Sequence, residues 1–279
     1  MKKSCVIGWP IQHSRSPIIH NYWLNKYNIA GHYGIVPVQP EDLQDFITSM
    51  VSAGYAGCNV TIPHKEAAFA FVKYRDERSS RLGAINTIYV SDDELHATNT
   101  DGEGFIANIK TDVPQIVLAN NSVAVLGAGG SAMAIAGALL DEDVSEILIF
   151  NRSIEKSQAL RQRFGKTVKP RAWELRNSHI SDSALLVNTT SLGMKGQPPL
   201  EIDLHALPVK AAVADIVYVP LTTPLLQQAR ARGHPTTGGL GMLLHQAVKG
   251  FELWFGIRPS VTAELYDLVA KDIDPGKAA

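Results

Sequence analysis

The sequence predicts an α/β protein of two domains, the second of which is built on a doubly wound parallel sheet. Short apolar runs with the character of buried strands alternate with helical patterns along most of the chain. This alternation is typical of sheets that carry helices on both faces. In addition, a glycine-rich turn joins a strand at 123–126 to a helix at 132–140. We expect one domain at 1–103 plus 240–279 and a second at 104–239, because the last helices have no strand to close and so return to the first domain.

Composition narrows the class of protein. Hydrophobic residues make up 45% of the 279 residues and charged residues 19%, with a formal net charge of -1. Because no dense Lys/Arg run is present, neither nucleic acid nor an anionic membrane is an expected partner. No apolar run approaches the roughly 20 residues that span a bilayer. The first residues lack a signal-peptide core, so we expect a cytoplasmic protein. Cys5 and Cys58 are then expected to be reduced thiols. We expect a monomer or a homodimer.

The expected elements follow the alternation of patterns. Strands are expected at 4–7, 33–36, a segment ending near Asn59, a hairpin of 82–89 and 95–98, and then 123–126, 147–150, 185–188 and 212–218. Helices are expected at 17–27 with Ser16 as N-cap, at 40–51, from Pro63, from near Asp101, and at 132–140, 225–232, 240–254 and 260–273. A glycine pair at Gly238 and Gly239 is a candidate hinge for domain closure.

The glycine turn has the spacing Gly127-x-Gly129-x-x-Ala132 of a dinucleotide-binding motif. Gly127 allows a tight turn, Gly129 allows backbone to approach a pyrophosphate, and Ala132 allows close packing of helix on strand. The N-terminus of the helix then attracts phosphate. A plain glycine turn is the alternative. The expected cofactor contacts here are Gly127, Ala128, Gly129, Gly130 and Ser131.

The residues after the next strand indicate which dinucleotide binds. An NAD site usually has Asp or Glu at this point to accept from the ribose 2′-hydroxyl. This chain has Asn151-Arg152-Ser153, with Lys156 one turn later. Two cations suit the 2′-phosphate of NADP, although they could also be solvated charges at the start of a helix. Cations are disfavoured at a helix N-terminus, so we favour NADP.

Polar residues also gather after the N-terminal strands. Ser14 and Ser16 are either helix caps or, with the free N–H groups of a helix start, a carboxylate site. Asn59, Thr61 and Lys65 follow a strand, at the sheet edge where open α/β sheets bind ligands. Taken alone, Lys65 could be an ordinary solvated lysine and the acidic residue Asp101 an ordinary N-cap.

Together these residues resemble the shikimate dehydrogenase family. Eight motifs occur in order over nearly the whole chain, which makes the resemblance specific. They are His13-Ser-Arg-Ser-Pro17, Asn59-Val-Thr-Ile-Pro-His-Lys-Glu66, Gly83-Ala-Ile-Asn-Thr87, Asn99-Thr-Asp-Gly102, Gly127-Ala-Gly-Gly130, Asn151-Arg-Ser153, Asn188-Thr-Thr-Ser-Leu-Gly193 and Gly239-Leu-Gly-Met242, followed by Gln246. The resemblance implies an N-terminal substrate domain with returning C-terminal helices, a Rossmann-type NADP domain, and a cleft between them. The activity that it implies is reversible NADPH-dependent reduction of 3-dehydroshikimate to shikimate, a step toward aromatic amino acids.

The resemblance also implies residue roles. Lys65 and Asp101 are the expected catalytic pair. The substrate contacts are Ser14 and Ser16 for the carboxylate, then Asn59, Thr61, Asn86, Gln246 and Tyr218, together with Lys65 and Asp101. The NADP contacts are the glycine turn, Asn151, Arg152, Ser153 and Lys156, with Ile216 and Gly239 near the nicotinamide. No residue is expected to bind a metal.

The chemistry of carbonyl reduction needs this set. As hydride reaches the carbonyl carbon, negative charge grows on the oxygen, and a positioned donor must neutralise it. Lys65 can donate as the ammonium, and a carboxylate at Asp101 would favour that charged form. The chain departs from the family pattern at His64, where many members have Phe. His64 could tune Lys65 or touch substrate, but we favour an ordinary loop side chain.

Two alternatives remain open at this point. One is a paralogue that uses quinate or accepts NAD, against which Arg152 and Lys156 argue. The other is a non-enzymatic NADP-sensing protein, which would be expected to lack Lys65 and Asp101.

Overall fold

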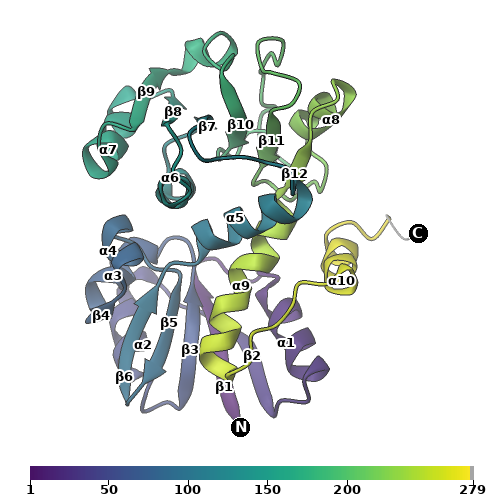
Figure 1. The fold of residues 1–279 in the computed structure, drawn as a ribbon. Helices are drawn as coiled ribbons and strands as arrows, with labels where there is room; N and C mark the ends of the chain where they lie inside the picture. Colours follow the sequence, from purple (N-terminus) through teal and green to yellow (C-terminus); the bar gives the residue numbers. More distant parts are fainter. Residues whose placement is uncertain (277–279) are drawn as a thin grey trace. The chain divides into compact units, whose positions relative to one another are not determined.

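The computed structural model describes residues 1–276, which fold into two compact units (Figure 1). Unit 1 comprises Met1–Thr100 and Gln246–Val269, and unit 2 comprises Asp101–His245 and the chain from Ala270. The chain passes between units before helix α5 (Asp101–Asp112) and again within helix α9 (Gly239–Phe255). These points lie at 100/101 and 245/246, whereas the expected boundaries are 103/104 and 239/240. The end of the chain differs, since the expected first domain continues past Val269.

Unit 1 is built on a mixed sheet. Its strands are β1 (Lys2–Gly8), β2 (Gly31–Pro37), β3 (Tyr55–Val60), β4 (Tyr74–Arg75), β5 (Thr87–Ser91) and β6 (Glu94–Thr98), in the order β2-β1-β3-β5-β6-β4. β1 pairs in parallel with β2 and β3, whereas β5 runs antiparallel to β3 and β6. The end of β3, the start of β5 and the end of β6 therefore share one edge, where Asn59 pairs with Thr87 and Thr87 with Thr98.

Helices cover both faces of this sheet. They are α1 (Ser16–Lys26), the 3₁₀ helix η1 (Pro40–Asp42), α2 (Leu43–Ser49), α3 (Lys65–Phe71), α4 (Glu77–Leu82) and the part of α9 from Gln246. Because successive strand residues point to opposite faces, each face has its own core. Cys5 and Cys58, both free thiols, pack with residues of α2 and α3 such as Ile47. An aromatic cluster from α1, β2 and α9, including Tyr33 and Trp254, fills the other face.

Unit 2 is a parallel doubly wound sheet. Its strands are β7 (Ser122–Leu126), β8 (Glu146–Asn151), β9 (Val168–Ala172), β10 (Ser183–Asn188), β11 (Ala212–Asp215) and β12 (Thr236–Gly238), in the order β12-β11-β10-β7-β8-β9. Every pairing is parallel. Chain order reverses between β7 and β10, so this is the Rossmann arrangement and that position is its topological switch point. The predicted fold class is confirmed.

Apolar strands with helices on both faces explain the core of unit 2. The helices are α5, α6 (Gly130–Asp141), α7 (Ile154–Phe164), η2 (Trp173–Asn177), α8 (Pro224–Ala231), the start of α9 and the end of α10 (Ala263–Ile273). Helices α5 and α6 pack on the face formed by Val123 and Val125, and α8 packs on the face formed by Ala124 and Leu126. No helix in the described part of the chain is both long and apolar enough to cross a membrane.

Candidate active site

The turn after β7 lies at the switch point of unit 2. Gly127 has φ of +105°, which favours glycine, and its N–H donates to the carbonyl of Phe150 at 2.8 Å. A Cβ at Gly127 would lie 2.8 Å from Oγ1 of Thr189, whose hydroxyl donates to the carbonyl of Leu126 at 2.7 Å. The turn after β7 therefore packs directly against the loop after β10, and position 127 requires glycine.

The start of α6 fits a phosphate group. Gly129 is the N-cap and has no side chain to satisfy the first N–H groups of the helix. A Cβ built at Gly129 or at Gly130 meets no atom within 4 Å, so both sites open to solvent. Ala132, by contrast, is fully buried in the core. This arrangement leaves room for close backbone approach and offers donors to an anion, as a pyrophosphate requires.

The end of β8 presents the two predicted cations. Arg152 and Lys156 are exposed, on either side of the start of α7. Nδ2 of Asn151 donates to the carbonyl of Ser153 at 2.8 Å, and Oγ of Ser153 donates to Oε2 of Glu155 at 2.6 Å. This second bond lowers the pKa of the Glu155 carboxyl. Glu155 is not among the predicted site residues, and its charge at this helix start opposes that of the cations.

The loops after β10 and β11 are joined by a buried carboxylate. Asp215 is 2% exposed, and its Oδ1 accepts from Nδ2 of Asn188 at 3.0 Å and from the N–H of Val217 at 3.1 Å. The apolar pattern of residues 212–218 predicts a strand that continues to Tyr218. It ends at Asp215 because the N–H of Val217 turns back to this side chain. Only the acidic end of an otherwise apolar strand could have indicated the network.

The glycines at the start of α9 have a packing role. A Cβ at Gly239 would lie 2.1 Å from the carbonyl oxygen of Ile216, and one at Gly241 would lie 1.8 Å from Oδ1 of Asn108. Gly239 and Ile216, both expected near the nicotinamide, are thus in direct contact within unit 2. Close approach of backbones accounts for Gly239 without a hinge. Tyr218, two residues after Ile216, is half-buried.

In unit 1, predicted substrate residues meet at the shared sheet edge. Nδ2 of Asn59 donates to the carbonyl of Asn86 at 3.2 Å. Nδ2 of Asn86 donates to Oγ1 of Thr100 at 3.0 Å and lies 3.5 Å from Oε1 of Gln246. Asn59, Asn86 and Gln246, far apart in sequence, thus belong to one polar cluster. Thr61, two residues after Asn59, is half-buried, and its N–H donates to the carbonyl of Ile7 at 3.0 Å.

The serines at the start of α1 differ in detail from expectation. Ser16 is the first helical residue and Arg15 occupies the N-cap, so Ser16 is not the cap. The N–H of Ser16 donates to Oγ of Ser14 at 3.3 Å, which means that Ser14 satisfies the helix start in its place. The N–H of Ser16 is one of the helix-start donors that have no acceptor within the helix, and Ser14 provides one.

Helix α3 begins at Lys65 and not at Pro63, and His64 is its N-cap residue. Lys65 is half-buried, and its carbonyl accepts from the N–H of Ile85 at 3.0 Å. His64 is 1% exposed, with Nε2 2.8 Å from the carbonyl of Val38. His64 therefore lies in the loop before α3, as expected, but its side chain is buried against Val38 and does not face solvent.

Asp101 is half-buried and is the first residue of α5, so the helix begins on it. It belongs to unit 2, whereas Lys65 belongs to unit 1. The pairing of Lys65 with Asp101 stays a prediction. No group of three or more His, Cys, Asp or Glu side chains suited to a metal ion occurs among residues 1–276.

These features define a class: an α/β protein with a Rossmann-type unit, a dinucleotide-binding turn at its switch point, and a second unit with a polar cluster at one sheet edge. Known families match both units. The model described as "Shikimate dehydrogenase substrate binding domain" matches residues 6–88, "Shikimate / quinate 5-dehydrogenase" matches residues 109–193, and "Shikimate 5'-dehydrogenase C-terminal domain" matches residues 239–263. The chain belongs to the shikimate dehydrogenase family.

Individual relatives agree with this assignment. Shikimate dehydrogenase (NADP(+)) of Rhodopseudomonas palustris strain TIE-1 is 54% identical over 274 residues, 98% of each chain. The crystal structure of shikimate 5-dehydrogenase from Thermus thermophilus, in complex with NADP(H) and shikimate, has a TM-score of 0.86 and 32% identity over 98% of this chain and 100% of that one. Quinate dehydrogenase from Corynebacterium glutamicum, in complex with NAD, has a TM-score of 0.88 and 28% identity over 96% and 98%.

Proposed function

We propose that this chain catalyses the reversible reduction of 3-dehydroshikimate to shikimate with NADPH. The observation that carries the proposal is the polar cluster of Asn59, Asn86 and Gln246, in the unit that matches the substrate-binding domain model. Amide groups both donate and accept, as recognition of ring hydroxyls requires. Relatives more than half identical over the whole chain carry the same activity in their names.

Unit 1 is the substrate domain and unit 2 the NADP domain in this proposal. Ser14 and Ser16 hold the substrate carboxylate. The ring hydroxyls are bound by Asn59, Thr61, Asn86 and Gln246, and Tyr218 covers the substrate. The glycine turn receives the pyrophosphate, and Ile216 and Gly239 border the nicotinamide. The enzyme is cytoplasmic in this proposal, and its reaction is a step toward aromatic amino acids.

Lys65 and Asp101 carry the proton chemistry. Bound NADPH supplies the hydride. Lys65, as the ammonium, donates a proton to the carbonyl oxygen while negative charge develops there. The carboxylate of Asp101 stabilises the charged form of Lys65 and orients it. In the reverse direction Lys65, as the neutral amine, accepts the proton of the shikimate hydroxyl while the hydride leaves the substrate carbon.

Preference for NADP over NAD rests on Arg152 and Lys156. Both side chains are exposed and able to reach a ligand, and no Asp or Glu stands at residues 151–153 to accept from a ribose 2′-hydroxyl. The rival is a paralogue that oxidises quinate with NAD, which the fold alone permits because a quinate dehydrogenase solved with NAD has the same architecture. The cation pair is what favours the first proposal over this rival.

The test is a grid of substrates and cofactors. Purified protein is offered shikimate or quinate, each with NADP or NAD, and reduced nicotinamide is followed by absorbance. Fast turnover confined to shikimate with NADP is the expected result. Turnover that favours quinate or NAD would identify the paralogue instead. Binding of NADP without turnover of either substrate would identify a non-enzymatic NADP-sensing protein, despite the presence of Lys65 and Asp101.

A further inference from the structure

Two fully buried residues outside the predicted site are hydrogen-bonded into the polar cluster of unit 1. The phenol of Tyr33, on β2, donates to Oδ1 of Asn59 at 2.5 Å. On the other side of Asn59, Nδ2 lies 3.3 Å from Oγ1 of Thr87, and the Thr87 hydroxyl donates to Oδ1 of Asn86 at 2.9 Å. Tyr33 and Thr87 are both 0% exposed. A continuous chain of hydrogen bonds therefore runs from Tyr33 through Asn59 and Thr87 to Asn86.

The donors and acceptors of this chain have one consistent arrangement. The carbonyl of Asn86 only accepts, so the amide nitrogen of Asn59 must face it at 3.2 Å. The amide oxygen of Asn59 must then face Tyr33, and the phenol must donate to it. At Asn86, Oδ1 accepts from the N–H of Thr100 at 2.9 Å, so its Nδ2 faces the hydroxyl of Thr100 and Gln246. Each amide therefore presents a defined donor and acceptor side.

The environment of Tyr33 keeps its hydroxyl in place. Its ring stacks on His20 with centroids 4.1 Å apart and an interplanar angle of 17°, and Trp254 packs 5.7 Å away. Burial raises the pKa of the Tyr33 phenol well above its usual value. Burial also lowers the pKa of His20 to about 3, so neither ring is charged near neutral pH. Tyr33 is thus a permanent donor held by packing on an aromatic cluster.

We propose that Tyr33 and Thr87 are positioning residues of the substrate site, which together with the backbone carbonyl of Asn86 and the N–H of Thr100 hold the amide orientations of Asn59 and Asn86, and hence the selectivity for ring hydroxyls. The inference rests on the proposed function, in which these two amides bind the hydroxyls. An amide that is free to flip would present the wrong group to a substrate hydroxyl, and a site built to bond a hydroxyl would then discriminate less well against an analogue that lacks it.

The test is Tyr33→Phe, which removes the hydroxyl and keeps the ring. Loss of the hydroxyl that donates to Oδ1 of Asn59 should raise KM for shikimate on the order of tenfold. KM for NADP should stay unchanged. The ratio of kcat/KM for shikimate to that for an analogue lacking one ring hydroxyl should fall by a similar factor. In an Asn59→Ala background Tyr33→Phe should have no further effect on KM. A purely structural role would lower thermal stability and leave that ratio as it is.

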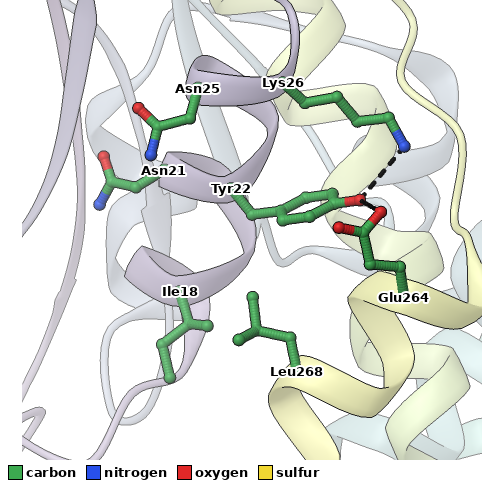
Figure 2. A pocket seen from close by; sticks show the side chains of 7 residues that line it. All are labelled: Ile18, Asn21, Tyr22, Asn25, Lys26, Glu264 and Leu268. Atoms are coloured by element: carbon green, nitrogen blue, oxygen red, sulfur yellow. Dashed lines mark hydrogen bonds between the residues drawn. The ribbon is translucent and has the colours of Figure 1, made fainter.

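Tyr22→Phe is the matched control. Tyr22 lies on α1 in the same unit, beside a surface groove of about 560 Å³. Its hydroxyl donates to Oε2 of Glu264 at 2.7 Å and accepts from Nζ of Lys26 at 3.1 Å, as Figure 2 shows. The variant loses the same group from a tyrosine whose hydroxyl is bonded to these two surface residues and not to Asn59. Both KM values and the selectivity ratio should stay at wild-type values.

A pair of Thr87 variants keeps the inference testable if Tyr33→Phe does not fold. Thr87→Val removes the hydroxyl and should raise KM for shikimate, whereas Thr87→Ser keeps the hydroxyl and should restore it. Wild-type KM and selectivity in folded Tyr33→Phe, or equal KM in the two Thr87 variants, would overturn the inference while the wild-type enzyme still reduces NADP with shikimate. A wild-type protein that neither binds nor oxidises shikimate would instead reject the proposed function and this inference together.

Discussion

The hydroxyl of Thr223 donates a 2.7 Å hydrogen bond to Oδ2 of the buried Asp215. Thr223 is also the N-cap of α8, where its Oγ1 accepts from the N–H of Leu226 at 3.4 Å. Asp215 therefore fastens the end of β11 to the start of the next helix, in addition to its bonds with Asn188 and Val217. One carboxylate organises the segment that holds Ile216 and Tyr218.

Asp215 should make stability depend on pH. Burial raises the pKa of its carboxyl to about 6, and the hydrogen bonds from Thr223, Val217 and Asn188 only partly oppose this shift. Because the folded-state pKa is above the unfolded one, the proton is bound more tightly in the folded state. This contribution is fully present below about pH 4 and is lost as pH rises through about 6, for a total of about 3 kcal/mol.

The measurement is urea unfolding of the wild type and Asp215→Asn between pH 4 and pH 7. Asparagine cannot titrate, so the difference in unfolding free energy between the two proteins isolates Asp215. As pH rises from 4 to 7, the free energy of unfolding of the wild type should fall relative to that of Asp215→Asn. A difference that stays flat across this range would show that burial does not perturb the carboxyl.

Gly239→Ala should disturb the segment expected at the nicotinamide. The new Cβ would lie 2.1 Å from the carbonyl oxygen of Ile216 and 2.9 Å from that of Val217, both rigid backbone atoms. We expect a loss of stability of about 1–3 kcal/mol, typical of overpacking, together with a higher KM for NADP. Thermal unfolding and steady-state kinetics check this. A variant with both properties unchanged would contradict the close contact.

Gly129→Ala should separate cofactor binding from folding. A Cβ there meets no protein atom within 4 Å, so the cost to stability should not exceed about 1 kcal/mol, the usual difference at an N-cap. The methyl group would occupy the space through which a pyrophosphate approaches the backbone. NADP affinity, measured by calorimetry, should fall on the order of tenfold, as for one lost hydrogen bond to a charged group. Unchanged affinity would mean that the pyrophosphate binds elsewhere.

Lys65→Met should remove the proton donor and keep the packing of the side-chain stem. Loss of a general acid lowers turnover on the order of a hundredfold or more. Steady-state kinetics of shikimate oxidation provide the measurement. A kcat near that of the wild type would reject Lys65 as the acid-base residue.

Removal of the cation pair should change cofactor preference. In the double variant Arg152→Ala with Lys156→Ala, KM for NADP should rise on the order of tenfold or more, since in our proposal each cation donates to the 2′-phosphate, whereas KM for NAD should not rise. The control is Arg161→Ala, which removes an exposed cation from the last turn of the same helix. Equal losses with NADP and NAD would show that the pair does not read the phosphate.

Local patterns were enough to predict much of the fold. Period-2 and period-3.6 apolar runs indicated the strands and helices, and the glycine spacing placed the turn at residues 127–129. The predicted ends of elements were wrong where a side chain accepts a hydrogen bond from a backbone N–H group. Ser14 and not Ser16 satisfies the start of α1, and the N–H of Val217 bonds to Asp215 and so ends β11 early. Such exchanges leave no periodic signal.

The sequence by itself determined the fold class, the dinucleotide-binding turn, the cation pair and the family, because each depends on residue types at short, regular spacings. Only the tertiary structure decided which polar groups face each other. Tyr33 and Thr87 are an ordinary strand tyrosine and threonine in the sequence, and Asp215 and His64 are polar residues of no evident role. Their burial and partners come from strand order and register, which join residues that are distant along the chain.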